Sequence, residues 1–195
     1  TEDNRVRKLD YSIQISKIFY ERFIKNAEIT LFSPNNVPDL YEAFGMPEFD
    51  DLYLKYEKDK SIPKKTIGAQ ELFMALLKER AETGRIYIMN LDHCNTHSSF
   101  KDKVYMSNLC QEITLPTTPV QHIDDKEGEI ALCILSAINL GLLTDMKELE
   151  ELCDLSVRAL DEIIDYQEYP VEAAKISAQS RRSLGIGYIG LAHYL

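Results

Sequence analysis

Three side chains suited to chemistry lie within the short run from Ser107 to Pro116: Asn108, Cys110 and Glu112. The run is rich in strand-forming residues and ends in a proline, so it is predicted to be extended. Successive side chains of an extended backbone alternate between two faces, which places these three on one face, within about 7 Å of one another. A hydrogen-bonding amide, a thiol and a carboxylate that can act as a base form a catalytic constellation.

A simpler interpretation stays open at this point, namely a polar edge strand that carries an incidental cysteine, because three-residue coincidences are common. A nucleophilic cysteine would need a neighbouring histidine or lysine. The nearest histidines, His97 and His122, are more than ten residues from Cys110. An adjacent carboxylate in a desolvated site favours the neutral thiol over the thiolate, so Cys110 is expected to be a poor thiolate.

Composition limits the classes of protein that this chain can belong to. The 195 residues are 45% hydrophobic, enough to build a core, and the net charge of −10 argues against a protein that coats DNA or RNA. The short basic pairs Lys64-Lys65 and Arg181-Arg182 are interpreted as solvated surface. No apolar run approaches the roughly 20 residues that cross a bilayer, and no signal peptide opens the chain. We therefore expect a soluble, cytoplasmic protein without a membrane partner.

The four cysteines, Cys94, Cys110, Cys133 and Cys153, form no C-x-x-C pair and no secreted disulfide framework. In a reducing compartment such residues are buried packing groups or reactive thiols. By itself, Cys133 in its apolar run would be a core cysteine. The chain begins without methionine and ends within an apolar stretch, from which we expect a cut or naturally split segment.

Hydrophobic periodicity predicts helices and strands in alternation. Strands separated by helices indicate an α/β architecture with buried parallel strands. The acidic run 122–128 is predicted to be a turn, and 92–100 a loop. Helices are expected over residues 10–25, 38–45, 48–59, 69–82, 145–166 (opened by a capping box of Asp145 and Glu148) and 171–180, and strands over 28–32, 85–91, 108–115 and 130–138, the last covered on both faces.

Two further motifs have weaker claims to function. His93, Cys94 and His97 have tolerable spacing for zinc, but no fourth ligand stands nearby, so a hydrogen-bonded turn is favoured and no metal site is predicted.

Residues 185–190 match G-x-G-x-x-G, the dinucleotide-binding pattern. A helix precedes this motif where a strand is required, and no acidic residue follows about 20 positions later. Close packing of a strand against a helix is the better interpretation.

Longer runs resemble one family along nearly the whole chain, in order and with matching spacing. That family is the large, catalytic subunit of aerobic (class I) ribonucleotide reductase, and the chain resembles a piece from its middle. The runs are Thr1 to Arg7, Tyr56 to Asp59, Thr83 to Ile88, Asp92 to His97, Ser107 to Ile113, Gly128 to Cys133, Asn139 to Gly141 and Arg181 to Gly187.

The resemblance implies a fold and a set of roles. Residues 1–195 would be a partial catalytic barrel domain, part of a ten-stranded α/β barrel with the cysteine-bearing segment as a finger loop at its centre. Cys110 would be the radical cysteine, Glu112 the base for the 3′-hydroxyl, and Asn108 would hold the sugar hydroxyls. Leu109 and Gln111 complete the substrate-binding segment.

The resemblance also reverses the interpretation of one further cysteine. Cys133 matches one half of the family's redox-active pair, whose other half would lie before Thr1. Cys94 and Cys153 match no catalytic position and are assigned to packing.

The implied reaction replaces the 2′-hydroxyl of a ribonucleotide, a ribonucleoside diphosphate, by hydrogen, for deoxyribonucleotide biosynthesis and DNA replication. The segment itself would bind no cofactor. The complete, allosteric enzyme would need a radical from a metal-containing small subunit, a thioredoxin- or glutaredoxin-type reductant, and the remaining segments of the large subunit, as a dimer. Two alternatives stay open: a catalytically silent segment that acts only in assembly, and an unrelated cysteine-containing binding domain.

Overall fold

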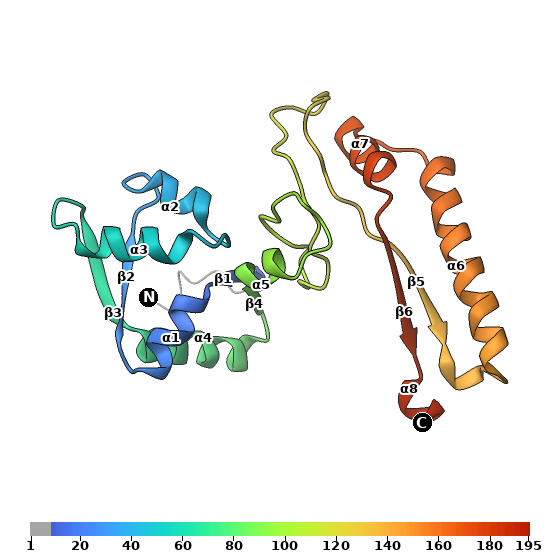
Figure 1. Cartoon of the computed structure of the whole chain (residues 1–195), viewed down its shortest axis with the longest axis horizontal. Coiled ribbons are helices and arrows are strands. Elements are labelled where there is room, and N and C mark those ends of the chain that lie inside the picture. The colour runs from blue at the N-terminus through green and yellow to red at the C-terminus, as the bar shows by residue number, and fades with distance from the viewer. Residues whose placement is uncertain (1–8) are drawn as a thin grey trace. The chain divides into compact units, whose positions relative to one another are not determined.

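The chain forms two compact units, Thr1–Pro116 and Thr117–Leu195. The computed structural model describes residues 9–195, so the run from Thr1 to Arg7, which contributed to the resemblance, lies outside the described residues. Both units contain helices and strands (Figure 1), which confirms the predicted mixed α/β class. Within residues 9–195, no helix combines the length and the apolar character that are needed to cross a membrane.

The described part of the first unit contains two pairs of strands joined by helices. β1 pairs in parallel with β4, with Ile13 opposite Ile88, and β2 pairs antiparallel with β3. In chain order the elements are β1 (Tyr11–Ile15), α1 (Lys17–Ile24), β2 (Glu28–Phe32), α2 (Pro38–Ala43), α3 (Phe49–Lys58), β3 (Lys64–Gly68), α4 (Ala69–Thr83), β4 (Ile86–Asn90) and α5 (Leu91–Thr96).

The predicted helix over residues 10–25 is wrong in its first half, where the chain forms β1 and only α1 is helical. Ser12 and Gln14 alternate with Ile13 and Ile15, the period of two that suits a strand. Ile15 is buried in the core and Ile13 packs against it. The apolar face of β1 therefore belongs to the core, and its polar face is left for other contacts.

Most other predicted elements of this unit are confirmed. The strand over 28–32 and the helices over 38–45, 48–59 and 69–82 appear within two residues of their expected ends. Gly84 ends α4 in the left-handed region, at φ 67°, and its N–H bonds to Arg80 O. β3 was not expected, and α5 replaces the start of the predicted loop over 92–100. β3 depends on pairing with β2, which local sequence does not reveal.

The second unit is a parallel strand pair packed against a long helix. β5 and β6 pair with Leu135 opposite Gly185, and α6 contacts both strands. The elements are β5 (Ile134–Asn139), a short 3₁₀ helix (Leu140–Leu142), α6 (Met146–Tyr166), α7 (Glu172–Arg181), β6 (Leu184–Ile189) and α8 (Leu191–Tyr194).

Two expectations for this strand pair need correction. The predicted strand over 130–138 begins only at Ile134. Within this unit the strand is not covered on both of its faces, because Leu135 is 55% exposed. The glycine motif packs strand against strand, not strand against helix. A Cβ added at Gly185 would lie 2.5 Å from Leu135 Cδ2, so glycine permits the approach of β5 to β6.

The predicted capping box at the start of α6 is present with one change. Asp145 accepts a hydrogen bond from Glu148 N at 2.8 Å. The Glu148 carboxylate in turn bonds to the backbone N–H and the hydroxyl of Thr144, one residue before the expected partner. The helix runs to Tyr166 as predicted, and α7 matches the expected helix within one residue.

Candidate active site

The cysteine-bearing run forms a turn where a strand was predicted. Gln111 N donates to Asn108 O at 3.2 Å, and Ile113 N donates to Asn108 Oδ1 at 3.0 Å. Gln111 adopts φ 65°, in the left-handed region. An asparagine side chain that satisfies a nearby backbone N–H competes with strand pairing, which explains the turn. The prediction that Asn108, Cys110 and Glu112 share the face of a strand is therefore wrong.

All three residues of this turn, Asn108, Cys110 and Glu112, are exposed. Cys110 is a free thiol. Within residues 9–195, neither its sulfur nor the Glu112 carboxylate has a hydrogen-bond or ion-pair partner, so both are available to a ligand. The Oδ1 atom of Asn108 accepts one hydrogen bond within the turn, and its Nδ2 amide has no hydrogen-bond partner among residues 9–195.

The polar face of β1 holds the segment that contains the turn. The amide Nε2 of Gln111 donates to the hydroxyl of Ser12. Two residues further along the same face of β1, Gln14 donates to the carbonyl of Tyr105 at 2.7 Å. Because the apolar face of this strand is anchored in the core, these two contacts connect the cysteine turn to a fixed element.

A second anchor lies just before the turn. Asn95 of α5 donates to Val104 O at 3.0 Å and accepts from Val104 N at 2.8 Å. Val104 is fully buried in a cluster with Met89 and Leu91. This pair of hydrogen bonds fixes the path by which the chain enters the turn.

Sequence reasoning missed Ser12, Gln14 and Asn95 as supporting residues. The alternation of polar and β-branched residues in β1 is a signal that could have revealed the first two, since it marks a strand with one polar face. No local pattern reveals Asn95, because its partner Val104 is nine residues away in an irregular loop.

Two cavities border the turn within the first unit. One, of about 610 Å³, is lined by residues that include Gln111 and Thr114, and the other, of about 490 Å³, by residues that include Ser12, Asn108 and Leu109. Volumes of this size suit a small organic ligand. The predicted substrate-binding segment thus lies where a ligand has room.

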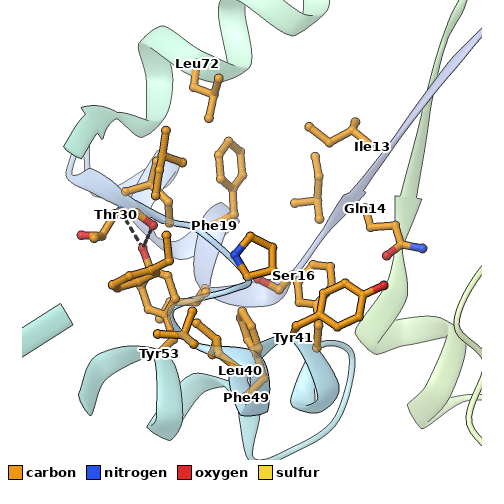
Figure 2. Close-up of a pocket in the computed structure, with 18 residues that line it drawn as sticks. Ile13, Gln14, Ser16, Phe19, Thr30, Leu40, Tyr41, Phe49, Tyr53 and Leu72 are labelled. Atoms are coloured by element: carbon orange, nitrogen blue, oxygen red, sulfur yellow. Dashed lines mark hydrogen bonds between the residues drawn. The ribbon is translucent and has the colours of Figure 1, made fainter. Parts of the chain in front are cut away.

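A third cavity, of about 340 Å³, lies in the core and contains none of the predicted site residues. Figure 2 shows its largely apolar lining, with Phe19, Leu40 and Phe49 around it. The Tyr53 hydroxyl beside it accepts from Thr30 N at 2.6 Å and donates to Thr30 O at 2.9 Å. These bonds satisfy the Tyr53 hydroxyl and the backbone polar groups of Thr30.

The two histidines whose spacing was considered for zinc, His93 and His97, lie at the C-terminal end of α5. His97 N bonds to His93 O at 3.0 Å, which caps α5 and confirms a hydrogen-bonded turn. Among residues 9–195 no group of three metal-ligating side chains comes together. Cys94 packs against the cluster of Met89 and Val104. Burial first, and then the charge of Asp92, raise the pKa of its thiol, in keeping with a packing role.

The other predicted redox residue, Cys133, is exposed and directly precedes β5 in the second unit. Ile130 N bonds to Ala173 O at 3.1 Å, and Ile134 pairs with Leu184 of β6. Cys133 therefore stands in a three-residue span between two fixed points. Cys153 is exposed on α6, so its assignment to packing is wrong within this chain.

The pair Arg181-Arg182 is not the solvated surface that was predicted. Arg181 makes a two-point ion pair with Glu129, at 2.5 and 2.9 Å. Arg182 bonds to Asp161 and Asp165 of α6, at 2.6 and 3.0 Å. These bonds lower the pKa of both aspartates below the ordinary value. The two arginines hold separate parts of the second unit together.

Comparison with known proteins matches the whole chain to one family. The family model described as "Ribonucleotide reductase, barrel domain" covers residues 1–195. The chain belongs to this ribonucleotide reductase family. Its relatives include proteins named ribonucleoside-diphosphate reductase subunit alpha from Haemophilus influenzae, 60% identical, and Buchnera aphidicola of Schizaphis graminum, 59% identical. Ribonucleoside-diphosphate reductase 1 subunit alpha of Escherichia coli is 57% identical.

Each of these alignments covers 100% of this chain but 26% of the relative. The chain thus spans about a quarter of the length of the reductase subunits that it matches. The family match confirms the resemblance inferred from the sequence motifs. The closed ten-stranded barrel and the roles of Asn108, Cys110, Glu112 and Cys133 stay predictions.

Proposed function

We propose that this chain is the active-site segment of a ribonucleoside-diphosphate reductase large subunit, which converts ribonucleotides to deoxyribonucleotides. One observation carries the proposal. Cys110 and Glu112 stand in a single exposed turn, bonded through Gln111 to β1, in a chain that matches the reductase barrel family from end to end. A free thiol beside an unpaired carboxylate suits hydrogen-atom transfer combined with proton removal.

In this proposal Cys110, as a thiyl radical, takes the hydrogen atom from C3′ of the ribose, so that a C–H bond breaks and an S–H bond forms. Glu112 accepts the proton of the 3′-hydroxyl. The 2′-hydroxyl leaves as water after gaining a proton. Cys133 and a second thiol from the rest of the subunit supply two electrons and two protons and become a disulfide. One of these protons leaves in the water and the other becomes the new hydrogen on C2′. Glu112 returns its proton to the 3′-oxygen, and Cys110 returns the hydrogen atom to C3′.

The turn geometry refines the role proposed for Asn108. Its Oδ1 atom accepts from Ile113 N, and its Nδ2 amide is a donor without a partner among residues 9–195. We therefore propose that Asn108 donates from Nδ2 to a ribose hydroxyl oxygen. Leu109 and Gln111 each line one of the two cavities that border the turn, and they complete the substrate-binding segment.

The finer parts of the architecture and assembly also belong to the proposal. The parallel pairs β1–β4 and β5–β6 would be parts of a ten-stranded barrel, with the Cys110 turn as its finger loop. The remaining segments of the large subunit would complete this barrel, and two large subunits would form a dimer in the cytoplasm. A metal-containing small subunit would supply the oxidising radical, and a thioredoxin- or glutaredoxin-type protein the reducing electrons.

Activity measured on two preparations tests the proposal. Residues 1–195 expressed alone should reduce no ribonucleotide, because the proposed reaction uses a second thiol and a radical source outside these residues. The same residues within a completed large subunit, mixed with the small subunit and a reductant, should reduce ribonucleoside diphosphates. Turnover by the isolated chain with a chemical reductant alone, or none by the complete assembly, would contradict the proposal.

A further inference from the structure

The proposed reaction makes no use of the ion pair between Arg181 and Glu129. Each of these two side chains is only 17% exposed. The guanidinium Nε and Nη2 atoms reach the two carboxylate oxygens of Glu129, a paired geometry that fixes orientation as well as distance. Such a half-buried pair is costly to break, because the remaining charge loses its partner.

Glu129 is itself part of a rigid stretch of backbone. Its N–H and C=O both bond to Thr118, at 3.0 and 3.2 Å. The turn before it is closed by Asp125, whose carboxylate accepts from the N–H groups of Gln121, Glu127 and Gly128. The position of Glu129 is thus set from several sides.

Cys133 follows four residues after Glu129, and the same part of the fold controls both of its flanks. Arg181 ends α7 and holds Glu129. Three residues later, Leu184 begins β6 and pairs with Ile134, the residue after the cysteine. The segment from Arg181 to Leu184 therefore holds the chain before and after Cys133 in one register.

We propose that Arg181 is a positioning residue for Cys133, acting through Glu129 on the backbone that leads into the cysteine. This inference rests on the proposed function of Cys133 as an electron donor to the substrate. Arg181 has no part in the first hydrogen abstraction at Cys110. Loss of the Arg181 side chain should therefore leave the first hydrogen abstraction intact. It should impair the later transfer of electrons, in which the Cys133 sulfur must lie close to the substrate and to the second thiol.

Arg181→Lys in the complete enzyme, with small subunit and reductant, tests this inference. Lysine keeps the charge but loses the two-point geometry. Release of tritium from 3′-labelled substrate should stay unchanged. The yield of deoxynucleotide per small-subunit radical lost should fall about tenfold, because small displacements of a reacting group are costly. Glu129→Gln removes the charge of the other partner with little change of shape, and it should give the same result. If Arg181→Lys does not fold, Glu129→Gln serves as the test.

Arg182→Lys is the matched control, because it makes the same change at the neighbouring residue, whose partners Asp161 and Asp165 lie on α6. Its yield per radical lost should equal that of the unmodified enzyme. A merely structural role of Arg181 would lower tritium release and product together and leave their ratio unchanged, which would overturn the inference. An equal fall in the yield per radical lost for Arg182→Lys would also overturn the inference. A complete unmodified enzyme that makes no product would instead refute the proposed function.

Discussion

Gln111 donates its side-chain amide to the hydroxyl of Ser12, a residue 99 positions earlier in the chain. Gln111 also occupies the left-handed backbone position that lets the chain turn back after Cys110. One residue therefore shapes the cysteine turn and attaches it to β1. Since the apolar face of β1 lies in the core, the position of the turn depends on the packing of the first unit.

Ser12→Ala should slow turnover of the complete enzyme about tenfold while leaving its stability nearly unchanged. The substitution removes one exposed hydrogen bond, which contributes about 1 kcal/mol to folding, but a loosened turn misplaces Cys110 relative to the substrate. The measurement is kcat together with the thermal midpoint. Ser61→Ala is a suitable control, because the Ser61 hydroxyl bonds only locally, to Asp59. Equal rates in the two variants would argue against the attachment.

In the complete enzyme, Glu112→Gln should slow turnover by about 100-fold or more and leave substrate binding largely intact. Glutamine keeps the size of the side chain but cannot take the proton of the 3′-hydroxyl. Within residues 9–195 the Glu112 carboxylate has no hydrogen-bond or ion-pair partner, so the change should not disturb the fold. Steady-state kinetics and a binding measurement separate the two effects. Near-normal turnover would remove the assignment of Glu112 as the base.

Cys110→Ser and Cys133→Ser should fail at different steps. A serine O–H bond is much stronger than a thiol S–H bond, so Cys110→Ser cannot readily form the radical that takes the 3′-hydrogen. Cys133→Ser should permit that abstraction and fail when electrons are needed. Tritium release from 3′-labelled substrate and decay of the small-subunit radical distinguish the two.

The serine variant of Cys110 should show neither signal. The serine variant of Cys133 should show radical loss that depends on substrate, without a normal yield of deoxynucleotide. Cleavage of the 3′ C–H bond by Cys110→Ser would disprove the central assignment.

The Asp125 turn should loosen in acid. Hydrogen bonds from Gln121 N, Glu127 N and Gly128 N lower the pKa of Asp125 below its ordinary value of 3.8. Because the folded pKa is depressed, the stability gained from this carboxylate is complete above pH 3.8 and is lost as the pH falls through the folded pKa. Hydrogen exchange of these three amides, corrected for its intrinsic pH dependence, should accelerate in that range. Asp125→Asn should abolish this acid response, and an unchanged response would contradict the assignment.

Local sequence was sufficient for the elements that carry their own signals. Pro38 and Gly45 delimit α2, Gly84 ends α4, and Asp145 begins α6 at the expected place. These residues act through backbone geometry and short-range hydrogen bonds, which do not depend on the rest of the fold. The family was likewise recognisable from the order and spacing of motifs, and the full-length family match confirms it.

The site needed tertiary structure, because its decisive contacts join distant residues. Strand-forming residues and a closing proline predicted a strand for the Cys110 segment, and apolar periodicity predicted a helix where β1 forms. The side chain of Asn108, the positive φ of Gln111 and the contact with Ser12 make the first a turn. β1 is a strand because it pairs with β4 and because Ile15 is buried in the core.

The arginine pair illustrates the same division. As sequence, Arg181-Arg182 is a short basic run that resembles any charged surface. In the fold, Arg181 meets Glu129 across 52 positions and Arg182 meets Asp161 across 21. Residue type and spacing determined which groups could do chemistry and which family they belong to. Only the packing of distant segments decided which polar groups are paired in structure and which, such as Cys110 and Glu112, have no partner among residues 9–195, because pairing depends on proximity in space.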